Sequence, residues 1–331
     1  MTAIASAAPL LVTMGDACGI GPEIIASLWR REAPRDAVVV GHVAVLRQAV
    51  AALGLELAVA ELQRPDEVVP PHCLPVWQPA GLPTDLADVA LGRVDARAGA
   101  AAARCIEAAV AEIQAGRGRA LVTAPIHKEA LHAAGSPYPG HTEMLQALAG
   151  GPPVRMMLAN EELRTVLVTI HCSLRDAIER VTRDNVLQTL AITAAALKRM
   201  GVRAPRIAVA GLNPHAGEGG LFGDEEILHI APAIADARAV GMDASGPYAP
   251  DTVFMRARRG EFDVVVAMTH DHGLIPVKYL GVEQGVNVTL GLPFVRTSPD
   301  HGTAFDIAGQ GRADPASLAA ALAMARRLAP A

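Results

Sequence analysis

The sequence has 331 residues, of which 51% are hydrophobic, 19% charged and 3% aromatic, and its formal net charge at pH 7 is −5. A negative net charge and so few aromatic side chains argue against nucleic acid as a partner, because that ligand needs cations for its phosphates and rings for base stacking. The four cysteines lack CxxC spacing and no run of 18 apolar residues occurs. We therefore expect reduced thiols, a cytoplasmic location and no membrane partner.

Apolar runs suited to buried strands alternate with helical patterns along the chain. The strand-like runs are residues 10–14, 37–41, 120–124, 165–170, 206–211 and 264–268. Helical patterns begin at Pro22 and Val43, and others span 98–115 and 315–328. This alternation predicts an α/β fold with a largely parallel sheet. The length predicts two lobes, because one domain usually holds roughly 100 to 200 residues.

Three segments between or within these elements are interpreted as structural. Residues 15–23, GDACGIGPE, contain three glycines between a strand and a helix. Their GxxxGxG spacing differs from both the dinucleotide and the P-loop patterns, and Asp16 stands where backbone amides would have to face a phosphate, so a structural turn is favoured. The proline-rich stretch 65–83 is interpreted as an irregular excursion and the alanine-rich helix 98–115 as core.

Polar clusters follow five of the strand-like runs, and in parallel α/β folds ligands bind beyond the carboxyl ends of the strands. The last three of these clusters contain His171, His215 and His270. Neutral imidazoles bind divalent zinc, cobalt, nickel or manganese, and three protein ligands leave coordination positions open for substrate. The pattern predicts a catalytic metal site, although a single histidine in such a place also serves as a hydrogen-bonded strand-end residue.

A second group of side chains is suited to an anion. Lys278, Asn287 and Arg296 recur at intervals of nine residues among apolar and glycine residues, which favours a bound phosphate or carboxylate over a surface ion pair. His141 and Thr142 stand just before a helical run, where they either bind the same anion or cap the helix.

Seven motifs together resemble those of the 4-hydroxythreonine-4-phosphate dehydrogenase (PdxA-like) family, and the resemblance extends from about Thr13 to Asp314. They are TMGDACGIGPE, HKEAL with GHTEML, GLNPHAGEGGLFGDEE, GPYAPDTVF, HDHGLIPVKYLG, GVNVTLGLPFVRTSPDHGTAFDIAG and GQGRADP. The resemblance implies a two-lobed fold like that of isocitrate and isopropylmalate dehydrogenases, with a central cleft. It implies a first lobe of residues 1–125 plus 275–331 with the cofactor loop, and a second lobe of 126–274 with the metal ligands and a homodimer interface.

The resemblance also assigns roles to individual residues. His171, His215 and His270 take the metal-ligand positions, with His270 supplied by the partner subunit. His141, Thr142, Lys278, Asn287 and Arg296 take the substrate-binding positions. Asp251 and Asp271 lie in motifs near the metal and are the candidate catalytic residues; Asp271 is the candidate proton acceptor or an orienting partner of a histidine. Residues His301, Gly302, Thr303, Ala304 and Asp306 match the adenosine-binding loop of isopropylmalate dehydrogenases.

The reaction implied is metal-dependent oxidation of a hydroxy acid by NAD, followed by decarboxylation of the β-keto acid; NADP as the cofactor, and zinc, cobalt, magnesium, manganese or nickel as the metal, stay open. The implied substrate is 4-phosphohydroxy-L-threonine or a related phosphorylated hydroxy acid. His272, Thr269 and Cys172 depart from the family pattern and leave the cis-dihydrodiol of terephthalate as an alternative. A three-histidine metal-dependent hydrolase and a non-catalytic anion-binding protein are the alternatives of other classes.

Overall fold

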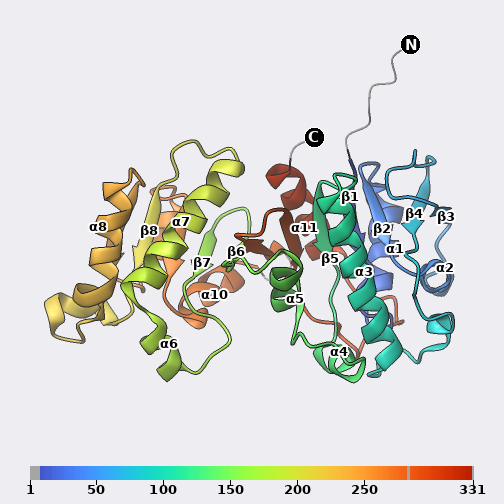
Figure 1. Ribbon diagram of the computed structural model, residues 1–331, viewed down its shortest axis with the longest axis horizontal. Helices are drawn as coiled ribbons and strands as arrows, with labels where there is room; N and C mark the ends of the chain where they lie inside the picture. Colours follow the sequence, from blue (N-terminus) through green and yellow to red (C-terminus); the bar gives the residue numbers. More distant parts are fainter. Residues whose placement is uncertain (1–7, 282–283, 330–331) are drawn as a thin grey trace, which may run out of the picture. The chain divides into compact units, whose positions relative to one another are not determined.

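The computed structural model describes residues 8–281 and 284–329, and it divides into two compact units (Figure 1). The first unit covers the chain up to Pro152 and again from Leu292, and the second is Pro153–Gly291. These bounds differ from the lobes expected from the sequence. Residues 126–152 belong to the first unit because their helices pack on the long helix of residues 96–114, and residues 275–291 belong to the second.

The first unit contains a parallel sheet in the order β3-β4-β2-β1-β5-β12. Its strands are β1 (Leu10–Thr13), β2 (Ala37–Val40), β3 (Ala58–Leu62), β4 (Cys73–Trp77), β5 (Ala120–Thr123) and β12 (Val295–Pro299). Every residue of β1, β2 and β5 is buried. Such continuous apolar runs are typical of parallel strands that helices cover on both faces.

One interpretation of the sequence in this unit is wrong. Residues 65–83 are not wholly irregular, because Cys73–Trp77 forms β4 between β2 and β3. Pro75 argues against a strand because it cannot donate to the ladder, yet Leu74 and Val76 on either side of it are fully buried. Burial of these neighbours overrides the local signal.

The helices of the first unit follow the predicted alternation. They are α1 (Gly21–Glu32), α2 (Val43–Ala52), the short η1 (Leu86–Asp88), α3 (Ala96–Gln114), α4 (Lys128–Ala133), α5 (His141–Leu148) and α11 (Ala316–Leu328). Asp95 caps α3 by accepting a hydrogen bond from the Arg97 amide. Gly99 allows α4 to approach, since a Cβ there would lie 2.0 Å from the Ala130 carbonyl oxygen. The prediction that this alanine-rich helix is core is confirmed, because one of its faces is buried.

The second unit has a mixed sheet in the order β11-β6-β7-β10-β8-β9. Its strands are β6 (Arg155–Ala159), β7 (Arg164–Leu167), β8 (Ile207–Ala210), β9 (Ala244–Tyr248), β10 (Val264–Ala267) and β11 (Val286–Leu290). Strands β7, β10, β8 and β9 are parallel, whereas β6 runs antiparallel to both β7 and β11. The predicted α/β fold with a largely parallel sheet is confirmed.

Helices and turns connect these strands. They are α6 (Leu174–Arg180), α7 (Arg183–Arg199), η2 (Pro214–Gly220), η3 (Glu226–Ile230), α8 (Ala231–Ala239), α9 (Val253–Arg258) and α10 (His270–Tyr279). The predicted metal ligands His171, His215 and His270 all belong to this unit, each shortly after a parallel strand. Within the described ranges, no helix is both long and apolar enough to cross a bilayer.

Candidate active site

His171 and His270 lie side by side. Strands β7 and β10 are paired in parallel with Leu167 opposite Ala267, and the pairing continues through a 2.9 Å hydrogen bond from the Val168 amide to the Ala267 carbonyl. His171 follows this pairing on one strand and His270 opens α10 after the other. Their ring centroids are 5.8 Å apart. The parallel register therefore brings together two of the three predicted metal ligands.

Asp271 orients one of these imidazoles. Its Oδ1 lies 2.8 Å from Nδ1 of His270. A carboxylate only accepts hydrogen bonds, so Nδ1 of a neutral His270 carries the proton and Nε2 keeps its lone pair. A metal-binding histidine commonly has such a carboxylate partner on its other nitrogen.

His215 lies in a left-handed turn after β8. His215, Ala216 and Glu218 have φ values of 52°, 53° and 44°, and the φ values of Gly217 and Gly219 in the same turn are also positive. Successive non-glycine residues in this region are costly because Cβ crowds the backbone. The His215 side chain projects from this turn, with Nδ1 3.2 Å from a Glu218 carboxylate oxygen.

Glu226 holds this turn in place. Its side chain is buried, and Oε1 accepts hydrogen bonds from the amides of Leu212 at 2.7 Å and Asn213 at 2.8 Å. Oε2 accepts from Nδ2 of Asn213 at 2.9 Å. Sequence reasoning did not identify Glu226. The only sequence signal for it is a run of three acidic residues, 224–226, shortly after a glycine-rich turn.

A cavity of about 430 Å³ opens beside the turn in the second unit. Its lining includes His215, Asp251, Asp271 and His272. The two predicted catalytic aspartates therefore share one cavity with a predicted metal ligand. Over residues 8–281 and 284–329, no three His, Cys, Asp or Glu side chains of the single chain are grouped closely enough to hold a metal ion.

The first unit carries a buried cation beside a neutral histidine. Arg296 on β12 is only 3% exposed and donates a 2.7 Å hydrogen bond to Oγ1 of Thr123 at the end of β5. Burial lowers the pKa of Arg296 to about 10, so the group stays cationic at neutral pH. Burial and, secondarily, the charge of Arg296 hold the pKa of His141 well below its ordinary value. Nε2 of His141 is buried without a hydrogen-bond partner.

The other predicted anion-binding residues are distributed over both units. Thr142 is half-buried in the first turn of α5, in the first unit. Lys278 in the last turn of α10 and Asn287 on β11 are half-buried residues of the second unit. The predicted set thus combines His141, Thr142 and Arg296 from one unit with Lys278 and Asn287 from the other.

The predicted cofactor segment packs on the glycine-rich turn of residues 15–23. The Ile20 amide donates a 3.0 Å hydrogen bond to the Thr303 carbonyl, and a Cβ at Gly19 would lie 2.9 Å from Cβ of Thr303. Thr303 is buried, Ala304 has a φ of 43°, and Asp306 is exposed. Nδ1 of His301 lies 3.0 Å from the Gly302 carbonyl oxygen. The turn therefore supports this segment.

Asp16 has a local role in that turn. Its Oδ1 accepts a 2.8 Å hydrogen bond from the Cys18 amide, and burial raises its pKa. This contact explains an acidic residue where a phosphate-binding loop would need free amides. Cys18 and the other three cysteines form no disulfide, in line with the expectation of reduced thiols.

Comparison with known proteins identifies the family. The family model described as pyridoxal phosphate biosynthetic protein PdxA matches residues 33–325. The chain is 56% identical over 322 residues to a 4-hydroxythreonine-4-phosphate dehydrogenase of Beijerinckia indica, covering 97% of this chain and 95% of that one. It is 46% identical to a D-threonate 4-phosphate dehydrogenase of Pectobacterium atrosepticum, covering 97% and 99% of the two chains.

A solved structure agrees with these relatives. The crystal structure of 4-hydroxythreonine-4-phosphate dehydrogenase from Klebsiella pneumoniae is 44% identical and superposes with a TM-score of 0.92, covering 99% of this chain and 100% of that one. The match to these dehydrogenases covers almost the whole length of each of them, so the prediction of an oxidoreductase is confirmed. The chain belongs to the PdxA family of pyridoxal phosphate biosynthetic proteins.

Proposed function

We propose that this protein oxidises a phosphorylated hydroxy acid with NAD, with the help of a divalent metal ion, and releases carbon dioxide from the resulting β-keto acid. The observation that carries the proposal is that His171, His215 and His270 all follow parallel strands of one unit, with Asp271 hydrogen-bonded to Nδ1 of His270. The names of the relatives support oxidation of 4-hydroxythreonine 4-phosphate or D-threonate 4-phosphate. The first of these reactions would place the protein in pyridoxine biosynthesis.

The donor atoms of the predicted ligands are of the kind that bind a divalent metal ion. His171, His215 and His270 would hold it through neutral imidazoles, as zinc, cobalt and nickel prefer. When bound, the ion lowers the pKa of the substrate hydroxyl and stabilises the negative charge that develops as carbon dioxide leaves. Zinc is the first candidate, because a site of three histidines is common for this ion.

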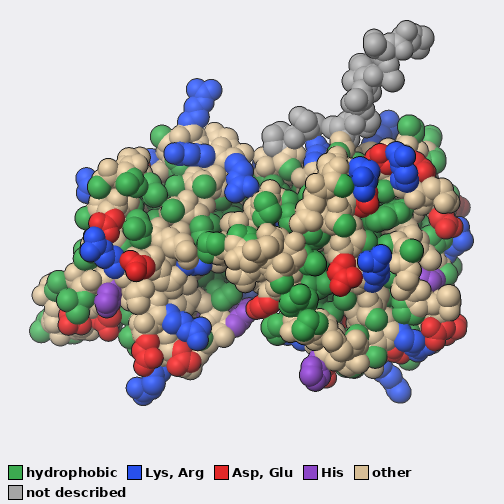
Figure 2. Space-filling model, viewed as in Figure 1, with side chains coloured by type: hydrophobic (Ala, Val, Ile, Leu, Met, Phe, Trp, Pro, Cys, Tyr) green, Lys and Arg blue, Asp and Glu red, His purple; other side chains and the backbone are tan. Residues whose placement is uncertain are grey.

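A homodimer would complete this ligand set. Among the described residues of one chain the three histidines do not form a metal-binding group, so we infer that a second copy completes the set by supplying His270. Apolar side chains beside the His215 turn are exposed, with Leu221 at 72% and Leu228 at 56%. Figure 2 shows hydrophobic side chains at the surface of the second unit around α8, which is labelled in Figure 1. Exposed apolar surface of this kind typically marks a protein interface.

The substrate anion would bind through groups that stay fixed in charge at neutral pH. Arg296 contributes a buried guanidinium, and His141 a neutral imidazole with one N–H to donate. Thr142, Lys278 and Asn287 would add a hydroxyl, an ammonium and an amide. A phosphate has enough acceptor oxygens for all of these donors.

The hydride and the proton have separate acceptors in the proposal. The C–H bond beside the hydroxyl breaks and its hydride passes to the nicotinamide ring, while the hydroxyl proton passes to a carboxylate. Oδ1 of Asp271 holds His270, which leaves Oδ2 to take the proton; Asp251 lines the same cavity and would orient the substrate. The β-keto acid then loses carbon dioxide, and the enolate carbon takes up the proton that the Asp271 carboxyl received in the first step.

We infer NAD as the cofactor in preference to NADP. His301, Gly302, Thr303, Ala304 and Asp306 would hold its adenosine half. The Asp306 carboxylate is exposed. An acidic residue accepts hydrogen bonds from ribose hydroxyls and repels a 2′-phosphate.

The test is NADH formation by metal-loaded protein with three substrates in parallel: 4-phosphohydroxy-L-threonine, D-threonate 4-phosphate and the cis-dihydrodiol of terephthalate. Turnover of either phosphorylated compound supports the proposal and identifies the substrate. Turnover of the dihydrodiol alone would assign the protein to aromatic degradation. No NADH with any of the three would refute the proposed substrate class.

A further inference from the structure

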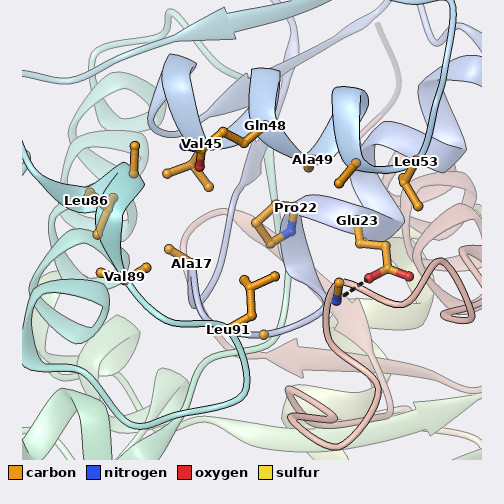
Figure 3. Close-up of a pocket in the computed structure, with 14 residues that line it drawn as sticks. Ala17, Pro22, Glu23, Val45, Gln48, Ala49, Leu53, Leu86, Val89 and Leu91 are labelled. Carbon is orange, nitrogen blue, oxygen red and sulfur yellow. Dashed lines mark hydrogen bonds between the residues drawn. The ribbon is translucent and has the colours of Figure 1, made fainter.

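Glu23 connects helix α1 to the chain just after the cofactor residues. It lies in the first turn of α1 and is 5% exposed. Oε2 accepts a 2.9 Å hydrogen bond from the Gly309 amide, which Figure 3 shows, and Oε1 accepts a 3.2 Å hydrogen bond from the Ala313 amide. One carboxylate therefore joins the first turn of α1 to a segment that follows it almost 290 residues later in the sequence.

The segment that Glu23 holds has no regular structure of its own. Residues 305–311 form successive turns rather than a helix or a strand. Amides that its own turns leave without an acceptor need one from outside the segment, and a bond to a carboxylate is among the strongest available. Gly309 has a φ of 75°, a left-handed conformation that glycine adopts without strain, and Cδ1 of Leu91 lies 2.4 Å from where a Cβ would stand.

The other end of the segment is also anchored to the start of α1. The Thr303 carbonyl accepts from the Ile20 amide, and a Cβ at Gly92 would lie 2.7 Å from the Phe305 carbonyl oxygen. Asp306 lies between these contacts and those of Glu23, and it is exposed. The position of its carboxylate thus depends on both anchors.

A cavity behind the segment makes the Glu23 anchor more important. About 240 Å³ of space lies between α2, the chain around Leu91 and the beginning of α1, with Pro22, Glu23 and Gly309 among its lining (Figure 3). Because this space is not filled by side chains, packing alone leaves the segment room to shift. The two hydrogen bonds of Glu23 remove that freedom.

We propose that Glu23 is a positioning residue for the cofactor: by holding Gly309 and Ala313 it sets the conformation in which Asp306 meets the ribose of NAD. The inference rests on the proposed function for the identity of the ligand. The anchoring itself rests on geometry alone.

The test compares Glu23→Gln with Glu32→Gln, an exposed residue in the last turn of the same helix. The glutamine amide keeps the shape of the side chain but turns an N–H donor toward one of the two backbone amides. In Glu23→Gln, hydrogen exchange should speed up in the peptide covering residues 303–314 and stay unchanged in α3. The dissociation constant of NADH, measured by its own fluorescence, and KM for NAD should both rise roughly tenfold.

The variants separate the possible outcomes. KM for the phosphorylated substrate should stay within about twofold of the wild-type value, and Glu32→Gln should match wild type in every measurement. Unchanged exchange at 303–314 would overturn the inference whatever the enzyme does. Faster exchange with unchanged NADH binding would also overturn it. Faster exchange in a protein whose wild type binds no NADH would instead refute the proposed cofactor.

Discussion

At the scale of single residues, the first unit presents a fixed positive charge beside a neutral imidazole. Arg296 donates to Thr123 from a buried position, and His141 stays neutral because burial and the neighbouring guanidinium both disfavour its protonated form. This combination suits a multiply charged anion, because the charge of the site does not change near neutral pH.

Replacing the guanidinium should damage substrate binding and leave the metal in place. In Arg296→Ala the phosphate would lose a charge-assisted hydrogen bond, and kcat/KM should fall about 10- to 100-fold, mainly through KM. Metal content should equal that of wild type. Arg203→Ala, at an exposed arginine of the second unit, is the control and should change neither quantity. Normal kinetics in Arg296→Ala would remove this residue from the substrate site.

The depressed pKa of His141 has a consequence for stability. The unfolded chain takes up a proton at this position below about pH 6.5 and the folded chain does not, so the unfolded state binds more protons. The free energy of unfolding should therefore decrease as pH falls below 6.5, by at most about 1.4 kcal/mol per pH unit from this group. The free energy of unfolding, measured with urea at several pH values between about 5 and 7, should depend less steeply on pH in His141→Gln than in wild type. Equal slopes would show that His141 protonates normally in the fold.

At the scale of elements, the parallel strands position the candidate site, and the turns after them supply its polar side chains. The register of β7 and β10 places His171 beside His270. The turn η2 after β8 adopts a left-handed path that its own sequence does not favour at His215, Ala216 and Glu218. The buried carboxylate of Glu226 stabilises this path through two backbone amides and one side-chain amide.

Removing that carboxylate should release the turn. In Glu226→Ala the buried amides of Leu212 and Asn213 lose their acceptor, which should cost about 2 to 5 kcal/mol of stability. Metal affinity should decrease as well, because His215 is no longer held. Urea unfolding and metal titration would measure the two effects, with Glu179→Ala on the exposed side of α6 as the control. A fully stable variant with normal metal affinity would contradict the role assigned to Glu226.

Among the strands, the sequence predicts those with apolar or β-branched runs and misses the others. Strands β1, β2, β5, β8 and β10 are short, buried on both faces and recognisable. Strand β4 contains Pro75, and β9 contains Gly246 and Pro247, so each gains its strand structure from neighbours rather than from local preference. Residues at strand ends were identifiable as candidates, but Glu23 and Glu226 act on segments distant in the sequence, and no local pattern reveals such partners.

At the scale of the whole molecule, the proposed homodimer determines which of the two chains supplies each of the three metal ligands. If a second copy supplies His270, two inactive variants can repair each other. A mixture of His215→Ala and His270→Ala, unfolded and refolded together, forms heterodimers in which one of the two sites keeps all three histidines. Since half of the dimers are mixed, activity should return to about a quarter of the wild-type value. A mixture as inactive as its components would mean that each site is closed within one chain.

The central claim is metal-dependent oxidation by NAD coupled to decarboxylation, and the most direct test is the stoichiometry of its products. Metal-loaded protein with NAD and a phosphorylated hydroxy acid should release NADH and carbon dioxide in equal amounts. Both products should disappear after chelation and return when the metal is restored. NADH without carbon dioxide would contradict the decarboxylation, and equal rates in the presence of a chelator would contradict the role given to His171, His215 and His270.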